Sequence, residues 1–177
     1  MRKLTTLLMA VYIISLSGCA LFNKDVKDIQ VDVVTDPKAN MSGYKTYSWL
    51  GAAEILNDPS KNWQPPKMDI GQDVKFLIDR ELNKQGIHSN NQNPELAVAF
   101  FIGVDMAAQQ LKDDPETQGD VLENIPQGGL VVALINIKTG FVVWVGVATA
   151  DIAEDASKEL VRSRLDYAVS EMFKSLK

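Results

Sequence analysis

The chain has 177 residues, among them 18 basic and 23 acidic side chains, one histidine and one cysteine. This length suits one domain with a sizeable core and is short for two. The net charge of −5, without any basic cluster, disfavours nucleic-acid binding, and an acidic surface is repelled by anionic lipid headgroups. Because a single cysteine cannot form a disulfide within the chain, stability must come from the core.

The first predicted element is a cleaved targeting signal rather than part of the folded domain. Arg2 and Lys3 precede the apolar run from Leu4 to Leu16, which is too short for a hydrocarbon core of about 30 Å. The run ends in a motif that resembles the lipobox of bacterial lipoproteins, namely Leu16, Ser17, Gly18 and Cys19. The resemblance implies cleavage before Cys19 and acylation of that residue.

The residue after Cys19 bears on the membrane to which the chain is sorted. Ala20 is not the aspartate that resembles an inner-membrane retention signal in many Gram-negative bacteria. We therefore expect a lipid anchor in the outer membrane, held firmly by two or three acyl chains, with the domain facing the periplasm. Residues 1–18 would be the signal peptide, 19–27 a lipidated tether and 28–177 a single domain.

Two strands are predicted at the start of the domain. Apolar and polar residues alternate over residues 29–33, and Asp36-Pro37 ends this strand. Residues 43–50 are rich in aromatic and β-branched side chains, which favours a second strand. Residues 51–67 show no clear period and contain Pro59 and Pro65-Pro66, which predicts a long surface connection.

Residues 69–85 are predicted to form an amphipathic helix. One arc of this helix carries Ile70, Val74, Leu77, Ile78 and Leu82. Gly86 follows at the position where a glycine commonly ends a helix. Glu81 projects into the apolar arc, either as a boundary residue that reaches water or as a carboxylate with a perturbed pKa.

The second half of the chain is predicted to hold three strands and a second helix. Residues 96–104 form an apolar run typical of a central strand, and the acidic residues 105–127 interrupt the pattern. Residues 129–137 and 141–150 are predicted to pair as a hairpin, because the Lys138-Thr139-Gly140 connection suits a three-residue loop. Residues 156–176 carry a second apolar stripe at helical spacing.

These elements predict an α+β fold, a two-layer sandwich in the order β-β-α-β-β-β-α. Each helix has a single apolar stripe, so both helices should cover one face of a mainly antiparallel sheet of about five strands.

Several of these segments resemble a family of bacterial lipoproteins, domain of unknown function 4136. The resemblance rests on the lipobox, on the segment Ser42 to Trp49 (SGYKTYSW), on the Lys138-Thr139-Gly140 turn and on Val143 to Gly146 (VWVG). It spans essentially the whole mature chain and implies an envelope lipoprotein of α+β fold, with no assigned chemistry. Asn136 and Val145 depart from the charged residues often found beside this turn, which weakens the idea of an ionic site there.

The residues offer little for catalysis or for metal binding. The one histidine, His88, lies in a polar turn, and one histidine without a free cysteine cannot build the usual zinc sites. A calcium-loop register at Asp114, Glu116, Gln118 and Gly119 lacks the final glutamate, since Ile125 stands there. No phosphate-binding glycine motif occurs, so we expect no metal and no cofactor.

Two functional hypotheses remain. The first is a non-catalytic binding or accessory module of the cell envelope, attached to the membrane through the anchor on Cys19. Tyr47, Trp49 and Trp63 would form its contact surface, toward a protein complex or toward a lipid or glycan. A lipid-binding version predicts an apolar cavity between helices and sheet, and a protein-docking version predicts a flat apolar patch. The second hypothesis is a hydrolase that uses two carboxylates, Glu81 among them.

Overall fold

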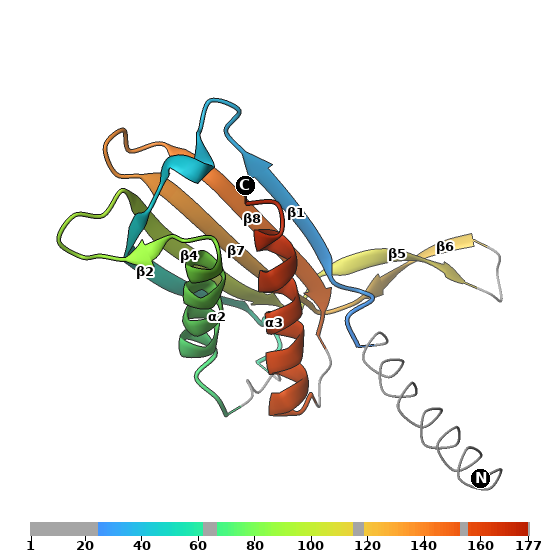
Figure 1. The fold of residues 1–177 in the computed structure, drawn as a ribbon. Helices are drawn as coiled ribbons and strands as arrows, with labels where there is room; N and C mark the ends of the chain where they lie inside the picture. Colours follow the sequence, from blue (N-terminus) through green and yellow to red (C-terminus); the bar gives the residue numbers. More distant parts are fainter. Residues whose placement is uncertain (1–24, 62–66, 115–118, 153–155, 177) are drawn as a thin grey trace, which may run out of the picture.

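The computed structural model of the chain describes residues 25–61, 67–114, 119–152 and 156–176. The strands of its main sheet are β1 (Gln30–Thr35), β2 (Thr46–Asn57), β3 (His88–Ser89), β4 (Leu96–Asp105), β7 (Gln127–Asn136) and β8 (Val142–Asp151). A 3-10 turn, η1 (Met41–Gly43), precedes β2, and the helices are α2 (Ile70–Lys84) and α3 (Lys158–Phe173). Both helices pack on one face of the sheet (Figure 1). The predicted α+β sandwich is therefore confirmed.

The six strands lie in the order β1-β8-β7-β4-β2-β3. The pairs β1–β8, β8–β7 and β7–β4 are antiparallel, whereas β2 runs parallel to β4 and to the short β3. The parallel pair follows from the connection, because α2 carries the chain across the sheet between β2 and β4. The sheet is mainly antiparallel, as predicted, with one strand more than expected.

The structure corrects the prediction at β2 and at the acidic insertion. Residues 51–57, expected to be an irregular connection, continue β2 and pair with β4 residue by residue after a bulge at Leu50. Residues 109–114 and 119–124, expected to be an irregular acidic segment, form a hairpin of β5 (Gln109–Asp114) and β6 (Gly119–Asn124). This hairpin projects from the side of the sandwich (Figure 1). For β2, the distant partner β4 supplies an order that the local sequence pattern does not reveal.

Local side-chain chemistry sets the ends of both helices. The Asp69 carboxylate accepts a hydrogen bond from the Gln72 amide at 2.9 Å at the start of α2, and Gly86 follows its last turn with a φ of 77°. The Ser157 hydroxyl accepts a hydrogen bond from the Leu160 amide at 3.1 Å at the start of α3. These are the side-chain caps and the left-handed glycine that helix ends favour.

The β7–β8 hairpin forms as predicted. Gly140 has a φ of 74° and donates its amide to the Asn136 carbonyl at 2.8 Å, which closes the turn. The Asn136 side chain accepts hydrogen bonds from the amides of Lys138 and Thr139. Asn136 therefore has a structural role in this turn that needs no charge.

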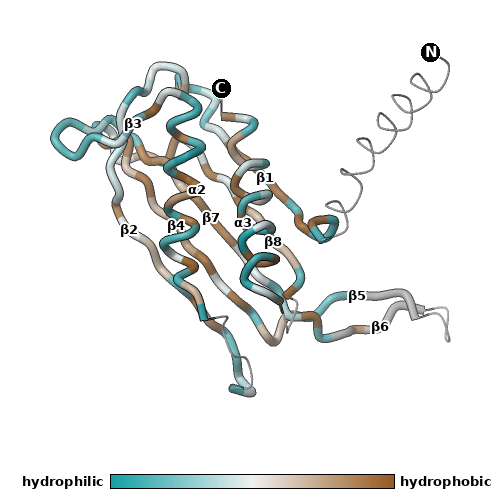
Figure 2. Tube along the Cα trace, turned by 60° about the horizontal axis from the view of Figure 1, so that its bottom comes forward, coloured by the Kyte–Doolittle hydropathy of each residue, from teal (hydrophilic) through white to brown (hydrophobic). Residues whose placement is uncertain are grey.

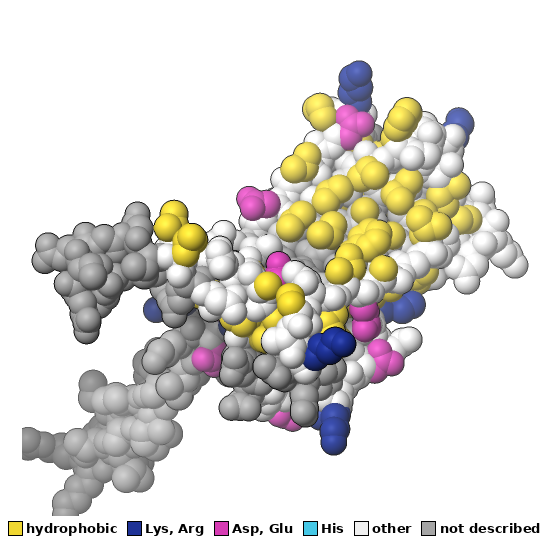
Figure 3. Space-filling model, turned by 180° about the vertical axis from the view of Figure 1, so that it is seen from behind, with side chains coloured by type: hydrophobic (Ala, Val, Ile, Leu, Met, Phe, Trp, Pro, Cys, Tyr) yellow, Lys and Arg dark blue, Asp and Glu magenta, His cyan; other side chains and the backbone are white. Residues whose placement is uncertain are grey.

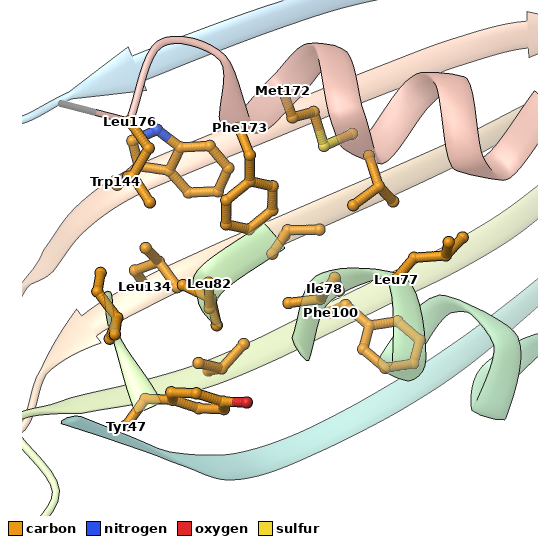
Figure 4. Close-up of a cluster of buried hydrophobic side chains, with 14 of the residues drawn as sticks. Tyr47, Leu77, Ile78, Leu82, Phe100, Leu134, Trp144, Met172, Phe173 and Leu176 are labelled. Atoms are coloured by element: carbon orange, nitrogen blue, oxygen red, sulfur yellow. The ribbon is translucent and has the colours of Figure 1, made fainter. Parts of the chain in front are cut away.

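Large side chains fill the core where the helices end (Figure 4). The rings of Trp144 and Phe173 have centroids 4.9 Å apart, and both side chains are buried. Gly146 lies against Trp144 and Met172, because a Cβ there would stand 2.7 Å from Trp144 Cη2 and 3.0 Å from Met172 Sδ. The glycine in the VWVG segment thus makes room for the indole. Figure 2 shows that apolar residues are frequent along β4, β7 and β8, the strands beneath the helices.

Candidate functional site

Two of the aromatic residues predicted to form a contact surface, Tyr47 and Trp49, join the sheet to helix α2. The Tyr47 hydroxyl and the Trp49 Nε1 both donate to Oδ1 of Asp79 on α2, the latter at 2.9 Å. Lys75 lies 4.6 Å from the Trp49 ring centroid and pairs with Asp79 Oδ2 at 2.9 Å. Burial raises the pKa of the Tyr47 phenol well above its ordinary value, and the Asp79 carboxylate adds to the rise.

Tyr47 cannot form part of the predicted contact surface as it stands in the fold, because only 1% of the residue is exposed. Strand alternation does place Tyr47 and Trp49 on one face, and that face is the one that the helices cover. Trp49 is half-buried beside a groove of about 260 Å³, so its role as a contact residue stays a prediction. Trp63 and the lipobox residues lie outside the described residues, and their roles also stay predictions.

Glu81 is buried in an ionic cluster that links the two helices. Its Oε1 accepts hydrogen bonds from Arg80 Nε at 2.8 Å and from Lys84 Nζ at 2.9 Å, and Arg80 also pairs with Asp166 on α3. Burial alone would raise the pKa of Glu81, but the hydrogen bonds and charges of Lys84 and Arg80 hold it below its ordinary value. A general acid needs a raised pKa, so this carboxylate is suited to an ion pair instead.

The other chemical groups of the described residues are dispersed. His88 is exposed, with its Nδ1 2.7 Å from the Asn83 side-chain oxygen. The part of the chain that the structure describes brings no three histidine, cysteine or acidic side chains together as a metal site. Within the same residues, each helix is too short or too polar to cross a membrane.

A cavity of about 520 Å³ lies between the helices and the sheet, at the end where α2 and α3 begin. Its larger wall residues include Ile70, Ile102, Leu130, Ile152, Val161 and Leu165. Its small wall residues include Gly103, Gly128, Gly129, Ala148, Ala150 and Ala168. The volume falls within the range of about 300 to 1,000 Å³ typical of small-molecule sites, which are mostly apolar. The sequence hypothesis of a lipid-binding module expected a cavity in this layer.

A polar cluster at this cavity is centred on Arg164. Arg164 donates to the Asp28 carboxylate, with Nη1 to Oδ1 at 3.0 Å, and to the carbonyls of Asp25 and Asp151, the latter at 3.1 Å. The hydrogen bond from Arg164 is the main reason why the pKa of Asp28 lies below its ordinary value. The cluster fixes the start of the domain, residues 25–28, beside the cavity.

The sheet face opposite the helices is a second apolar surface (Figure 3). Strand alternation places on it Val34, Ala99, Phe101, Val131, Val145 and Val147. Val34 is 70% exposed and Phe101 is 45% exposed. Exposed apolar patches of this kind mark interaction surfaces. The flat patch expected of a protein-docking module is thus present beside the cavity expected of a lipid-binding one.

The cavity is the feature that the sequence analysis did not place. Each wall residue reads as an ordinary core or strand position, and the walls come from β2, β4, β7, β8 and both helices. One local signal exists, since Gly128 on β7 pairs with Ala150 on β8, and Ala148 lies two residues before Ala150 on the same face of the sheet. Such residues leave space where neighbouring positions carry leucine or valine.

Two solved structures are similar to this chain, and the first of them agrees with the fold. A DUF4136 family protein from Bacteroides thetaiotaomicron is 13% identical, with 83% of this chain and 95% of that chain covered and a TM-score of 0.50. A structure described as a PelC dodecamer from Paraburkholderia phytofirmans is 14% identical, with 84% and 96% covered and a TM-score of 0.46. Likeness at these identities concerns the fold alone. No curated protein is similar to this chain.

The sequence itself gives a broader assignment. The family model of DUF4136, a domain of unknown function, matches residues 31–176. This range includes every strand of the main sheet except one residue of β1, and both helices. The chain therefore belongs to the DUF4136 family.

Proposed function

We propose that this protein is a lipid-anchored component of the cell envelope that binds an apolar ligand in the cavity between helices and sheet, without catalysis. The cavity carries the proposal, since about 520 Å³ of space with largely apolar walls suits binding. The buried carboxylate best placed for hydrolysis, Glu81, is committed to ion pairs with Arg80 and Lys84.

The anchor is supported by the sequence at the start of the chain. The apolar run and the Leu16-to-Cys19 motif favour acylation of Cys19, and Ala20 favours the outer membrane, facing the periplasm. Labelled palmitate should enter the full-length protein and should not enter a Cys19→Ala variant. The labelled protein should sediment with the outer membrane, and Ala20→Asp should move it to the inner membrane. A wild-type protein without label would contradict the anchor.

The binding site can be tested in the native cell with a photo-reactive amino acid in the full-length protein. At position 161, on the α3 wall of the cavity, irradiation should attach a small apolar molecule that mass spectrometry detects. The same probe at position 101, on the open sheet face, is the comparison. Small-molecule capture at position 101 and none at position 161 would refute the proposed site.

A filled cavity provides the matched control. Ala168→Phe places a ring in the cavity and should reduce the adduct at position 161 at least tenfold. Ala53→Phe makes the same change on β2, at a position that does not line the cavity, and should leave the adduct unchanged. If Ala168→Phe lowers the unfolding temperature, Val161→Trp with the probe at position 165 provides an independent filled variant.

A further inference from the structure

The walls of the cavity restrict the chemistry of its ligand. Much of the lining consists of methyl groups, from Ile70, Ile102, Leu130, Val161 and Leu165. The charged residues of the lining are Glu54, Asp151 and Arg164. A sugar or a polar cofactor would lose hydrogen bonds to water among such walls without replacing them. A hydrocarbon chain loses none, and each buried CH₂ group contributes about 0.8 kcal/mol.

The charges at the cavity restrict the head of the ligand. The guanidinium of Arg164 is bound by the Asp28 carboxylate and by two backbone carbonyls. Glu54 and Asp151 are exposed carboxylates of the lining. A head with a net negative charge, such as a free carboxylate, would approach these acids, and the cation among the described lining residues, Arg164, is already paired, so the head would be repelled.

The start of the domain places the cavity near the membrane anchor. Arg164 holds Asp25 and Asp28 at the cavity, and Ile29 is one of the lining residues. Cys19 lies six residues before Asp25, and six residues of extended chain span at most roughly 20 Å. If Cys19 is acylated, the cavity is therefore held within reach of membrane lipids and of the acyl chains on Cys19 itself.

We infer that the cavity holds one fatty acyl chain whose head is uncharged or zwitterionic. This inference rests on the proposed function, because it names the ligand of the proposed site. The fatty acyl chain has two possible sources, a glycerolipid of the membrane or the acyl group on the protein's own anchor. The chemistry at the cavity is the same for both.

The test uses cells fed a fatty acid that carries a photo-reactive diazirine near its methyl end. After irradiation, the full-length protein is purified and its cross-linked peptides are identified by mass spectrometry. A cross-link from the peptide around Val161 and Leu165 to a glycerolipid would support the inference with a membrane source. A cross-link from that peptide to the Cys19 peptide would support it with the anchor as source. Ala168→Phe should reduce either cross-link at least tenfold, and Ala53→Phe should not.

Other outcomes would overturn the inference. The inference would be overturned by acyl cross-links confined to the open sheet face, or by the absence of acyl cross-links at the cavity. Capture of an isoprenoid or another non-acyl molecule at position 161 would overturn the acyl assignment and leave the proposed function standing. The absence of any small molecule at position 161 would refute both the acyl inference and the proposed ligand binding. Failure of the inference alone can therefore be distinguished from failure of the proposed function.

The head of the ligand is tested with the purified protein in one detergent. A photo-reactive monoacylglycerol should label the cavity peptide at least ten times more than the free fatty acid of the same chain does. The ratio should fall with added salt, which screens the acidic groups. Equal labelling, or a preference for the free acid, would overturn the assignment of the head.

Discussion

The two ends of the helix–sheet sandwich share their strands and helices and differ in how they are filled. Where the helices end, Trp144 and Phe173 lie against Leu134 and Leu82 in a packed core (Figure 4). Where the helices begin, Ala150 and Ala168 are among the small residues that border about 520 Å³ of space. Unfilled apolar space forfeits packing contacts, so the hollow end is less favourable for stability than the packed end. This difference is what the proposed function requires, with the packed end for stability and the hollow end for binding.

The largest expected effect is at the packed end. Trp144→Ala should lower the free energy of unfolding by about 3 to 5 kcal/mol, since it removes a fully buried ring from packed surroundings. Phe101→Ala removes a ring from the open sheet face, where 45% of the residue is exposed, and should cost markedly less. Urea unfolding of both variants makes the comparison. Equal losses would contradict the view that the covered face alone carries the core.

A smaller difference in stability is expected when one methyl group is added at each end of the sandwich. Gly146→Ala places a Cβ 2.7 Å from Trp144 Cη2 and should cost about 1 to 3 kcal/mol of unfolding free energy. Gly128→Ala, at a cavity-lining position on the helix-covered face of β7, places a Cβ 3.1 Å from Ile152 Cδ1, which is the end of a flexible side chain. It should be neutral, or stabilise by about 0.4 to 1 kcal/mol through a less flexible unfolded chain. Thermal unfolding of the pair would show whether the two positions differ in this direction.

The ion pair beside the cavity should make stability depend on pH. The pKa of Asp28 is lowered in the folded protein by Arg164, so its contribution is present above the unfolded value near 3.8 and is lost as the pH falls through the folded value. Asp28→Asn should cost about 1 to 2 kcal/mol at pH 7 and progressively less toward pH 3. Asp32→Asn, an exposed change on β1, is the control. An Asp28→Asn cost that does not change with pH would contradict the ion-pair account.

The smallest expected effect has the opposite sign. Ala168→Leu adds apolar atoms inside the cavity and should raise the free energy of unfolding by about 0.5 to 1 kcal/mol while weakening ligand capture at position 161. Ala53→Leu, outside the cavity, should change neither quantity by as much. A loss of stability on filling the cavity would mean that its walls are already closely packed.

Periodic patterns and turn residues predicted most of the fold, because they depend on neighbouring residues. The helix start at Asp69, the helix end at Gly86 and the turn at Gly140 depend on local interactions. The structure has all three where the sequence predicted them. The continuation of β2 beyond Gly51 could not be predicted in this way, because its partner is β4, about fifty residues away. The β5–β6 hairpin was missed because its residues are acidic and lack the usual alternation.

The candidate site was harder to predict than the fold. Tyr47 and Trp49 were predicted to form a contact surface. Aromatic residues on strands occur both in cores and at interfaces, and here the position of α2 decides which of the two applies. The cavity is the space left between six separate elements, which no single stretch of sequence reveals. The lipobox-like motif, by contrast, is continuous, so residues Leu16 to Cys19 alone are enough to predict a lipid anchor.

The central claim, an acyl chain in the hollow end of the sandwich, is tested most directly by crystals of the protein grown with a monoacylglycerol that carries bromine on its acyl chain. The account predicts an anomalous bromine peak between α3 and strands β7 and β8, bordered by Leu130, Val161 and Leu165. A bromine peak on the open sheet face beside Phe101, with an empty cavity, would contradict it.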